Sequence, residues 1–346
     1  MEPVLFLRIA KTIIGLFGIL GNGTVCLVIF RIEAMHTLTN ALIFNQAVID
    51  FVSCLFMLCH SNIPDSSSIP DGLAGTLYCQ LWNAPVLIFA VLVASTFSLI
   101  VLTLERYVAI IHPFKYIKIF NRRGSIVLIA GVWITAFGYK LIDMARYGMR
   151  DGQCFTKSVS WKKGLGIIQF SVQYFLPLVV MLFAYLHIII ILRRSEQLAR
   201  VNTIRVLAKA PDSVQRSESG PGTASNNIEN HQQLETLDSG LRRAQRNTFK
   251  TLLIVYIAFL VCWTPNQFIF LFWNLGLPVD NSSVVYRLTV VMACSNSAVN
   301  FIIYALKYRQ FRKGVKRLFG IRNDVNPVVT NFDASVRGTC SENKIS

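Results

Sequence analysis

The chain has 346 residues, of which 53% are hydrophobic and only 15% are charged, and its formal net charge at pH 7 is +16. Soluble proteins carry about a quarter charged residues, so this composition excludes an ordinary soluble fold and indicates that lipid surrounds most of the chain. The basic residues are divided among several segments between apolar runs, which argues against nucleic-acid binding and favours attraction to anionic lipid.

Seven apolar segments follow one another along the chain. Five contain no Asp, Glu, Lys or Arg, namely residues 12–30, 81–104, 164–192, 251–279 and 288–306. Residues 38–59 are interrupted only by Asp50, and residues 125–139 are followed by Lys140 and Asp143. The five charge-free segments reach the roughly 20 residues that a helix needs to cross a bilayer. Because helices satisfy their own backbone polar groups in hydrocarbon, we predict an all-α membrane protein, a seven-transmembrane helix bundle.

The segments between the spans set the orientation. Most of the 34 Lys and Arg residues fall in the loops after the first, third and fifth spans and in the C-terminal segment. Such residues accumulate on the cytoplasmic side, so we predict a multi-pass protein of the plasma membrane with an extracellular N-terminus and a cytoplasmic C-terminus. Residues 1–11 are then a short extracellular tail, and residues 12–306 form the transmembrane domain.

Two cytoplasmic segments have distinctive compositions. The loop 193–246 is rich in Ser, Gly, Pro and Asn in its middle, 210–233, which we predict to be disordered. Residues 307–320 place apolar side chains at helical spacing among basic ones, which predicts a short amphipathic cytoplasmic helix on the membrane surface. Residues 321–346 are polar and are predicted to be a disordered cytoplasmic tail.

Asp50 is a carboxylate inside an otherwise uncharged span. Inserting it costs roughly 2.5–3.5 kcal/mol even on a lenient scale, so it must face the bundle and have polar partners. Polar side chains occur at comparable depth in other spans, and they are Asn22, Ser95, Asn296, Ser297 and Asn300. An acid among several oxygens is a cage for a small hard cation, or alternatively a purely structural network.

Charges and prolines mark three further spans. Glu105 and Arg106 follow the charge-free run 81–104, where end charges often reach the interface. Pro177 and Pro265 interrupt the fifth and sixth spans, and each frees a backbone carbonyl and permits a kink. Trp263 lies next to Pro265, with Phe259 one turn away, as a bulky lever at a hinge or as ordinary aromatic packing.

Taken together, these motifs resemble the rhodopsin-like (class A) G protein-coupled receptors. The matching residues occur in the expected helices and order: Gly21-Asn22, Ala47-Val48-Ile49-Asp50, Cys79, Glu105-Arg106-Tyr107, Trp133, Pro177 with Tyr185, Cys262-Trp263-Thr264-Pro265, Ser295-Asn296-Ser297, Asn300 and Tyr304. Within that family the chain looks most similar to neuropeptide receptors of the somatostatin and galanin type.

The resemblance implies roles for these residues. The G-protein switch would comprise Glu105, Arg106, Tyr107, Tyr185 and Tyr304. Arg106 would be held by Glu105 at rest and released to Tyr185 and a heterotrimeric G protein on activation. Neighbours on a helix face each other poorly, so we expect a weak latch. Asp50, Ser95, Asn296 and Asn300 match the family's sodium pocket, and Phe259, Trp263 and Pro265 match its toggle. Arrestin and membrane lipid are further expected partners.

Cysteines and a sequon add two modifications. Cys79 and Cys154 are the two cysteines at outer-face positions, where the compartment is oxidising, and we expect them to form a disulfide. Asn281 begins an Asn-Ser-Ser sequon in an outer loop and is a candidate for glycosylation.

The sequence departs from the family in two places. Phe301 stands where relatives usually have proline, which removes an expected kink and puts the inward movement of Tyr304 in doubt. The interval from Cys79 to Arg106 is also two residues longer than usual.

The ligand class can be narrowed by what two spans lack. Residues 80–104 contain no Asp or Glu to pair an amine, and residues 288–306 contain no Lys for a retinal Schiff base. Amide, aromatic and arginine side chains remain as the candidate ligand pocket: Gln169, Gln173, Asn266, Gln267, Phe270, Trp273, Tyr286 and Arg287. They suit peptide backbones and carboxylates, which favours a neuropeptide, with a lipid mediator or other small molecule as the alternative.

The same residues argue against other classes of membrane protein. A seven-helix transporter or pump should carry a chain of buried charges across the membrane, and none is visible. An enzyme is not expected, because the spans hold neither a zinc-binding His-Glu-x-x-His motif nor paired catalytic aspartates. No cofactor is expected apart from sodium as an allosteric ligand.

Overall fold

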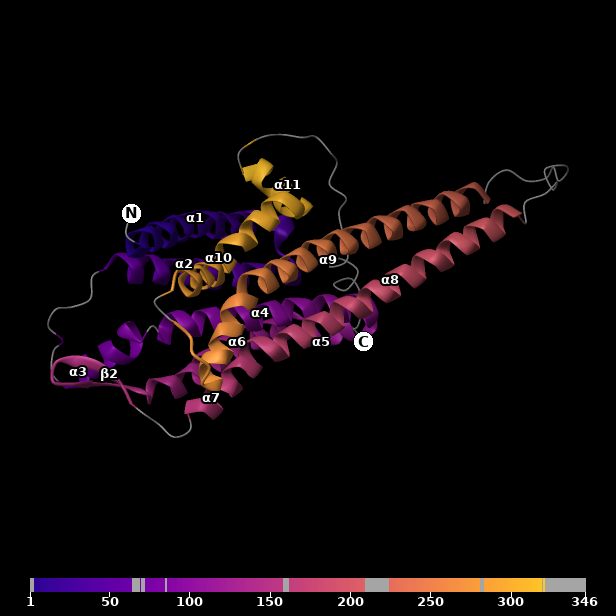
Figure 1. The fold of residues 1–346 in the computed structure, drawn as a ribbon. Helices are drawn as coiled ribbons and strands as arrows, with labels where there is room; N and C mark the ends of the chain where they lie inside the picture. The colour runs from indigo at the N-terminus through magenta and orange to yellow at the C-terminus, as the bar shows by residue number, and fades with distance from the viewer. Residues whose placement is uncertain are drawn as a thin grey trace, which may run out of the picture.

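The structure, a computed structural model, describes residues 3–63, 69, 72–84, 86–157, 162–208, 224–280, 283–318 and 320. Within these residues, seven helices are long and apolar enough to cross a membrane, as the sequence predicts. They are α1 (Pro3–Arg31), α2 (Leu38–Asn62), α4 (Val86–Ile111), α6 (Arg122–Met144), α8 (Leu176–Ala208), α9 (Ala224–Leu275) and α10 (Val284–Lys307). Their long axes run side by side as a bundle, from which α8 and α9 extend at one end (Figure 1).

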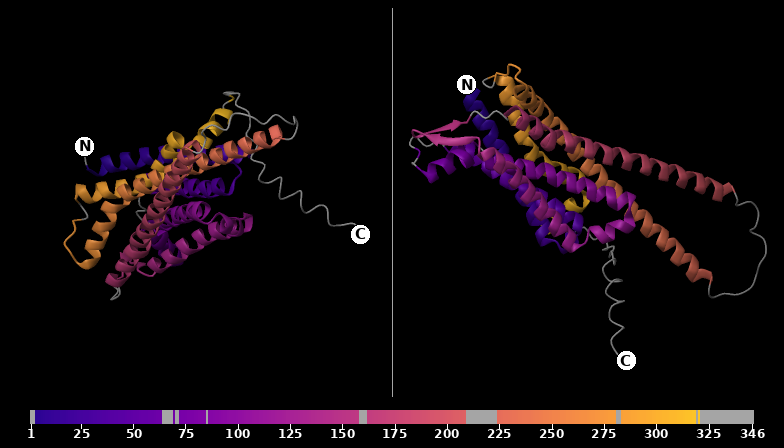
Figure 2. Two further views of the ribbon diagram at one scale, coloured as in Figure 1. Left: turned by 90° about the vertical axis from the view of Figure 1, so that its right-hand side faces the viewer. Right: turned by 90° about the horizontal axis from the view of Figure 1, so that it is seen from below.

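Short elements cap the two ends of the bundle. One end carries α3 (Leu73–Leu77), η2 (Tyr78–Asn83), the strands β1 (Tyr147–Arg150) and β2 (Gln153–Thr156), and α7 (Lys162–Phe170), which continues through η3 (Ser171–Phe175) into α8. The other end carries η1 (Glu33–Met35), α5 (Pro113–Ile119) and α11 (Arg309–Leu318). Figure 2 shows the hairpin at one extreme and the projecting parts of α8 and α9 at the other.

The first end is called the disulfide end below. Strands β1 and β2 are antiparallel, with Met149 opposite Cys154. Asp151 and Gly152 both have positive φ at the turn, which suits a two-residue hairpin. Cys154 is bonded to Cys79 of η2. The expected disulfide is therefore confirmed, and it ties the hairpin to the start of the third span.

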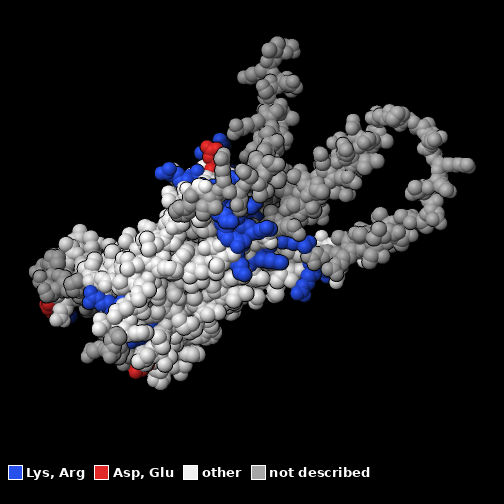
Figure 3. All heavy atoms as spheres, turned by 90° about the horizontal axis from the view of Figure 1, so that it is seen from above, with Lys and Arg blue, Asp and Glu red and all other residues white. Residues whose placement is uncertain are grey.

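The second end is called the basic end. Lys and Arg side chains gather there over the region of α11, whereas few charged side chains lie along the length of the bundle on the same face (Figure 3). In α11, Phe311 is buried and Gly314 packs close to Val28 and Met35, while the basic side chains of the helix stay exposed. This arrangement agrees with the amphipathic pattern of residues 307–320.

Two helices reach further than the sequence predicts. Helix α1 starts at Pro3 and so includes residues 3–11 of the expected tail. Proline is well tolerated in a first turn, and the Arg8 guanidinium donates to the Asn62 carbonyl at 3.2 Å. Helix α9 starts at Ala224 and so includes residues 224–233 of the loop segment that was predicted to be disordered; these residues contain no proline and several good helix formers. Residues 209–223 and the tail 321–346 lie outside the described residues.

The interval between Cys79 and Arg106 is interrupted at the disulfide end. Residues of η2 form a π-helical turn, which takes more residues per turn than an α-helix, and α4 begins afresh at Val86. Near the other departure, the ring of Phe301 lies against Gly21, where any side chain would collide with it, and 5.0 Å from the ring of Phe17. In place of a proline that would kink α10, the chain therefore has a phenylalanine whose ring packs against α1 at Gly21.

Candidate functional site

Asp50 of α2 lies at the centre of the bundle and is fully buried. Its carboxylate accepts hydrogen bonds from Ser95 Oγ at 2.9 Å, from Asn300 Nδ2 at 2.7 Å and from Gln46 Nε2 at 3.1 Å. These three donors come from α4, α10 and α2, and all are neutral. No salt bridge engages Asp50 within the described part of the chain. The carboxylate is therefore hydrogen-bonded but has no cationic partner.

Four buried amide oxygens of the polar residues in these spans have no partner in the described part of the chain. Gln46 Oε1, Asn300 Oδ1, Asn296 Oδ1 and Asn22 Oδ1 are all buried and accept no hydrogen bond from the described residues. Gln46 and Asn300 contact Asp50 directly, and Asn296 lies one turn before Asn300. Leaving a buried acceptor unsatisfied costs about 1–3 kcal/mol. A carboxylate with several unpaired carbonyl oxygens is a ligand set that fits a small hard cation such as sodium.

Glu105 and Arg106 form a buried ion pair at the basic end of α4. The guanidinium contacts both carboxylate oxygens of Glu105 through Nε and Nη2. Thr39 Oγ1 and the Tyr116 hydroxyl each donate to Glu105 Oε1 at 2.9 Å. Burial and the Glu105 carboxylate raise the pKa of Tyr116 to about 12, so this phenol stays a donor at neutral pH. The expectation that the two neighbours face each other poorly is wrong, because their long side chains curl toward one another.

The other expected switch residues lie on nearby helices. Tyr185 of α8 is buried, and its hydroxyl is 3.2 Å from Thr103 Oγ1, one turn before Arg106. Tyr304 of α10 is 1% exposed, and its hydroxyl has no hydrogen-bond partner among the described residues. Tyr107 is turned to α8, where its hydroxyl lies 3.0 Å from His187 Nδ1. Tyr185 and Tyr304 are thus buried in the bundle core, and Tyr107 is directed elsewhere.

An aromatic pair separates these networks from a cavity at the disulfide end. Trp263 is 2% exposed and lines the cavity, and its ring centroid is 6.2 Å from that of fully buried Phe259. The indole N–H of Trp263 has no partner in the described part of the chain. Pro265 lies two residues further along α9, inside the helix. The pair therefore lies between the cavity, which Trp263 lines, and the bundle core, in which Phe259 is buried.

The cavity has a volume of about 360 Å³ and is lined from α1, α2, α4, α6, α7, η3, α9 and α10. Seven of the eight side chains assigned to a ligand pocket from the sequence line it, and they are Gln169, Gln173, Asn266, Gln267, Phe270, Trp273 and Tyr286. Arg287, the eighth, is not among the lining residues, because it lies one residue beyond Tyr286 on a different side of α10. Asn281 falls outside the described residues.

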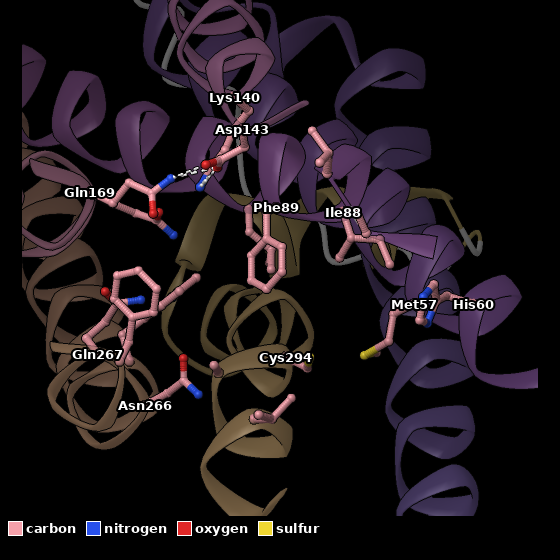
Figure 4. A pocket seen from close by; sticks show the side chains of 18 of the residues that line it. Met57, His60, Ile88, Phe89, Lys140, Asp143, Gln169, Asn266, Gln267 and Cys294 are labelled. Atoms are coloured by element: carbon pink, nitrogen blue, oxygen red, sulfur yellow. Dashed lines mark hydrogen bonds and ion pairs between the residues drawn. The ribbon is translucent and has the colours of Figure 1, made fainter. Parts of the chain in front are cut away.

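A charged cluster lies on one wall of the cavity. Asp143 of α6 accepts both hydrogen bonds of Gln169 Nε2, at 2.6 and 2.7 Å. Lys140 Nζ donates to the same carboxylate at 3.2 Å and Arg146 Nη1 at 3.5 Å. All four side chains are buried, and none of these residues is more than 8% exposed. Figure 4 shows Lys140, Asp143 and Gln169 together, across the cavity from Cys294 and on the side away from His60.

This cluster was missed from the sequence. From the sequence, Lys140 and Asp143 follow a short apolar run, and Arg146 received no assignment. The available signal was their spacing, because three charged residues at intervals of three share one face of a helix. Gln46, four residues before Asp50, was overlooked for the opposite reason: an uncharged amide does not interrupt a span.

The chain matches the sequence profile of the "7 transmembrane receptor (rhodopsin family)" over residues 21–304. It is 26% identical to galanin receptor 2a of Danio rerio, in an alignment that covers 89% of this chain and 76% of the relative. It is 27% identical to neuromedin-U receptor 1 of Rattus norvegicus, covering 91% and 74%. Identity to octopamine receptor beta-1R of Drosophila melanogaster is 28%, covering 87% and 59%.

A profile match over most of the chain agrees with the seven spans, the disulfide and the buried polar networks described above. Members of this family are signalling receptors rather than enzymes. The chain therefore belongs to the rhodopsin family of seven-transmembrane receptors, as a multi-pass membrane protein that binds an extracellular ligand and couples to a G protein.

Proposed function

We propose that this receptor binds a peptide in the cavity above Trp263 and thereby activates a heterotrimeric G protein. The observation that carries the proposal is the lining of that cavity: amides for a peptide backbone, from Gln173, Asn266 and Gln267 among others, beside aromatic rings for side chains. The names of two relatives, galanin receptor 2a and neuromedin-U receptor 1, agree with a peptide ligand.

An amine is the second candidate, because octopamine receptors are also relatives. An ammonium ligand needs a carboxylate with free acceptor capacity. Asp143 is the one carboxylate among the described residues that line the cavity, and four donor contacts already engage it. An amine would have to displace Gln169 or a cation from it, so a peptide is favoured. A lipid mediator is disfavoured because four charged and four amide side chains are among the residues that line the cavity.

In the proposed mechanism, a peptide that enters the cavity shifts Trp263 against Phe259. Helix α9 then pivots near Pro265, where the missing backbone hydrogen bond makes the helix easier to bend. The pivot opens the basic end, and Arg106 leaves Glu105 for Tyr185 and the G protein. Release separates the ion pair and also the contact of Arg106 Nη2 with Thr39 Oγ1, whereas Thr39 and Tyr116 can keep donating to the Glu105 carboxylate.

The proposal includes an orientation and a regulatory ion. The disulfide end would be extracellular and the basic end cytoplasmic, with α11 on the inner lipid surface and arrestin sharing the G-protein face. Sodium would be held by Asp50, Ser95, Asn296 and Asn300, and it would supply a positive charge to the buried carboxylate. The polar groups found around Asp50 support this assignment.

The test is ligand-induced binding of a non-hydrolysable GTP analogue to membranes that contain the receptor, scanned against a peptide library and an amine panel. We expect peptides to promote exchange and amines to be inactive. Arg106→Ala should abolish exchange while binding of the active peptide survives. Arg150→Ala, an exposed arginine on β1, serves as the control and should leave both unchanged. Activation by amines alone would overturn the proposal.

A further inference from the structure

The charged cluster on the cavity wall contains more hydrogen-bond donors than acceptors. We infer that Lys140 and Arg146 form a binding site for a carboxylate of the ligand, with Asp143 as the group that positions them. This inference rests on the proposed peptide ligand and adds the chemistry of one ligand group: a free C-terminus or an acidic side chain.

The acceptor side of the cluster is already filled. A carboxylate offers about four lone-pair positions. Asp143 receives two hydrogen bonds from Gln169 and one contact each from Lys140 and Arg146. Lys140 belongs to α6, Arg146 follows the end of that helix, and Gln169 belongs to α7. Asp143 therefore has no capacity left for a ligand, and its role is to hold the cations in place.

The donor side of the cluster is not filled. An ammonium carries three N–H groups and a guanidinium five. Among the described residues, one hydrogen bond engages the ammonium of Lys140 and one, at 3.5 Å, engages the guanidinium of Arg146. Arg146 lines the cavity and is 7% exposed, and its Nε is buried without a partner among the described residues. Buried charged donors of this kind are strongly stabilised by an additional acceptor.

The charge balance of the cavity points the same way. Three cationic side chains line it, Lys11, Lys140 and Arg146, against the single carboxylate of Asp143 among the described lining residues. Water screens charges less in a partly open, largely apolar cavity than in bulk solvent, so the excess positive charge attracts an anion. A carboxylate compensates this charge and matches the planar fork of an arginine.

Aromatic rings keep both cations at the cavity. Lys140 Nζ lies 5.6 Å from the ring centroid of Phe89 and 5.3 Å from that of Tyr139. The guanidinium carbon of Arg146 lies 5.9 Å from the ring centroid of Tyr147. Cation–π contacts of this length hold a cation without consuming its N–H groups. The site is thus preorganised, and the wall beside it can receive the side chain next to the bound carboxylate.

The experiment uses a peptide library synthesised in matched parts and tested on the full-length receptor in membranes. One part has free C-termini and no Asp or Glu, a second has amidated C-termini and contains Asp or Glu, and a third is amidated with Asn and Gln in their place. The readout is GTP-analogue binding. We expect active peptides in the first or second part, which identifies the source of the carboxylate, and a potency loss of 10-fold or more in their neutral counterparts.

Receptor variants then locate the site. Arg146→Gln leaves the pair of Lys140 and Asp143 intact, so the fold should survive. It should lower the potency of the acidic peptides by about 10- to 100-fold, as expected for a hydrogen bond to a charged group. Arg146→Lys, which keeps the charge, should lose less. Lys163→Gln removes an exposed charge at the same end, outside the cavity lining, and should change nothing. Surface expression of every variant is measured alongside.

The outcomes separate this inference from the proposed function. Active peptides with equal potency in the neutral part would overturn the carboxylate site and leave the peptide receptor standing. Acidic peptides whose potency is unaffected by Arg146→Gln and by a second variant, Lys140→Met, would also overturn it. If no part of the library promotes exchange, the peptide proposal fails and the carboxylate site fails with it.

Discussion

Two buried carboxylates in this receptor have opposite surroundings. Asp50, in the centre of the bundle, is contacted by neutral donors only and lies among amide oxygens that have no partner in the described residues. Asp143, on the cavity wall, is contacted by two cations and an amide, and a buried guanidinium N–H beside it has no partner. The first region has spare acceptors and the second has spare donors.

This difference shows that burial of a charge does not by itself define a site. A site is defined by whether the hydrogen-bonding groups that remain without partners are acceptors or donors. Spare acceptors around Asp50 suit a cation, and spare donors around Asp143 suit an anion. The Glu105 and Arg106 pair has neither to the same degree, because Thr39 and Tyr116 complete the carboxylate. It is suited to a contact that opens and closes rather than to a small ligand.

The largest expected difference in stability is between variants that neutralise one or the other of these two carboxylates. Asp143→Asn leaves Lys140 and Arg146 buried without a counter-charge and should lower the free energy of unfolding by about 3–5 kcal/mol. Asp50→Asn removes a buried charge that has no cationic partner and should change it by less than about 1 kcal/mol in either direction. Thermal unfolding of the detergent-purified receptor measures both.

Asp151→Asn is the matched control for this pair of variants. Asp151 is exposed in the hairpin turn, where its φ of 51° is also well tolerated by asparagine, so its effect should stay within about 0.5 kcal/mol. A larger loss for Asp50→Asn than for Asp143→Asn would reverse the contrast between the two regions.

The amides that contact the carboxylates should differ in the same direction by a smaller amount. Gln169→Leu removes two hydrogen bonds to Asp143 and should reduce stability by about 1.5–3 kcal/mol. Gln46→Leu removes one bond to Asp50 and one to Ser95, but it also removes an unsatisfied oxygen. The stability loss of Gln46→Leu should therefore stay below about 1 kcal/mol. Equal losses in the same unfolding assay would contradict the idea that Gln46 is only partly satisfied.

A sodium titration tests the spare acceptors directly. Replacing N-methylglucamine by sodium at constant chloride should raise the stability of the purified receptor by about 1 kcal/mol when sodium exceeds its dissociation constant several-fold. Asp50→Asn should lose this response, and Asp151→Asn should keep it. A response that is the same in Asp50→Asn would place the ion elsewhere.

The sequence predicts the bundle well, and particular residues show why. A charge-free run such as 251–279 has one low-energy environment, a membrane-spanning helix, and α9 contains residues 251–275 of it. The disulfide was equally determined, because few cysteines lie outside the apolar runs. The cavity lining was predicted in large part, since amides and aromatic residues near the ends of spans have few alternatives to facing the bundle.

What could not be predicted depends on contacts between distant residues. Asp143 and Gln169 are separated by a hairpin, and nothing local indicates that one amide would donate twice to that carboxylate. Arg287 was assigned to the pocket although its neighbour Tyr286 occupies that side of α10. Helix α9 includes residues 224–233. This could not be predicted, because composition alone does not distinguish a polar loop from a polar helix.

The smallest expected effect concerns Phe301, close to the Asp50 region. A proline inside a helix usually costs about 3 kcal/mol, partly because it leaves the carbonyl four residues earlier without its donor. Here that carbonyl belongs to Ser297, and Asn22 Nδ2 already donates to it at 2.9 Å. Phe301→Pro should therefore be less stable than Phe301→Ala by under about 1 kcal/mol, with the alanine variant accounting for the lost ring contacts with Gly21 and Phe17.

Ala305→Pro, one turn further along α10, is the matched control for this substitution. It would free the carbonyl of Phe301, which accepts no side-chain hydrogen bond from the described residues, and it should reduce stability by about 3 kcal/mol. If Phe301→Pro, corrected with Phe301→Ala, costs as much as Ala305→Pro, then Asn22 does not compensate the backbone. The hydrogen-bonding reserve of the central region would in that case be limited to the oxygens around Asp50.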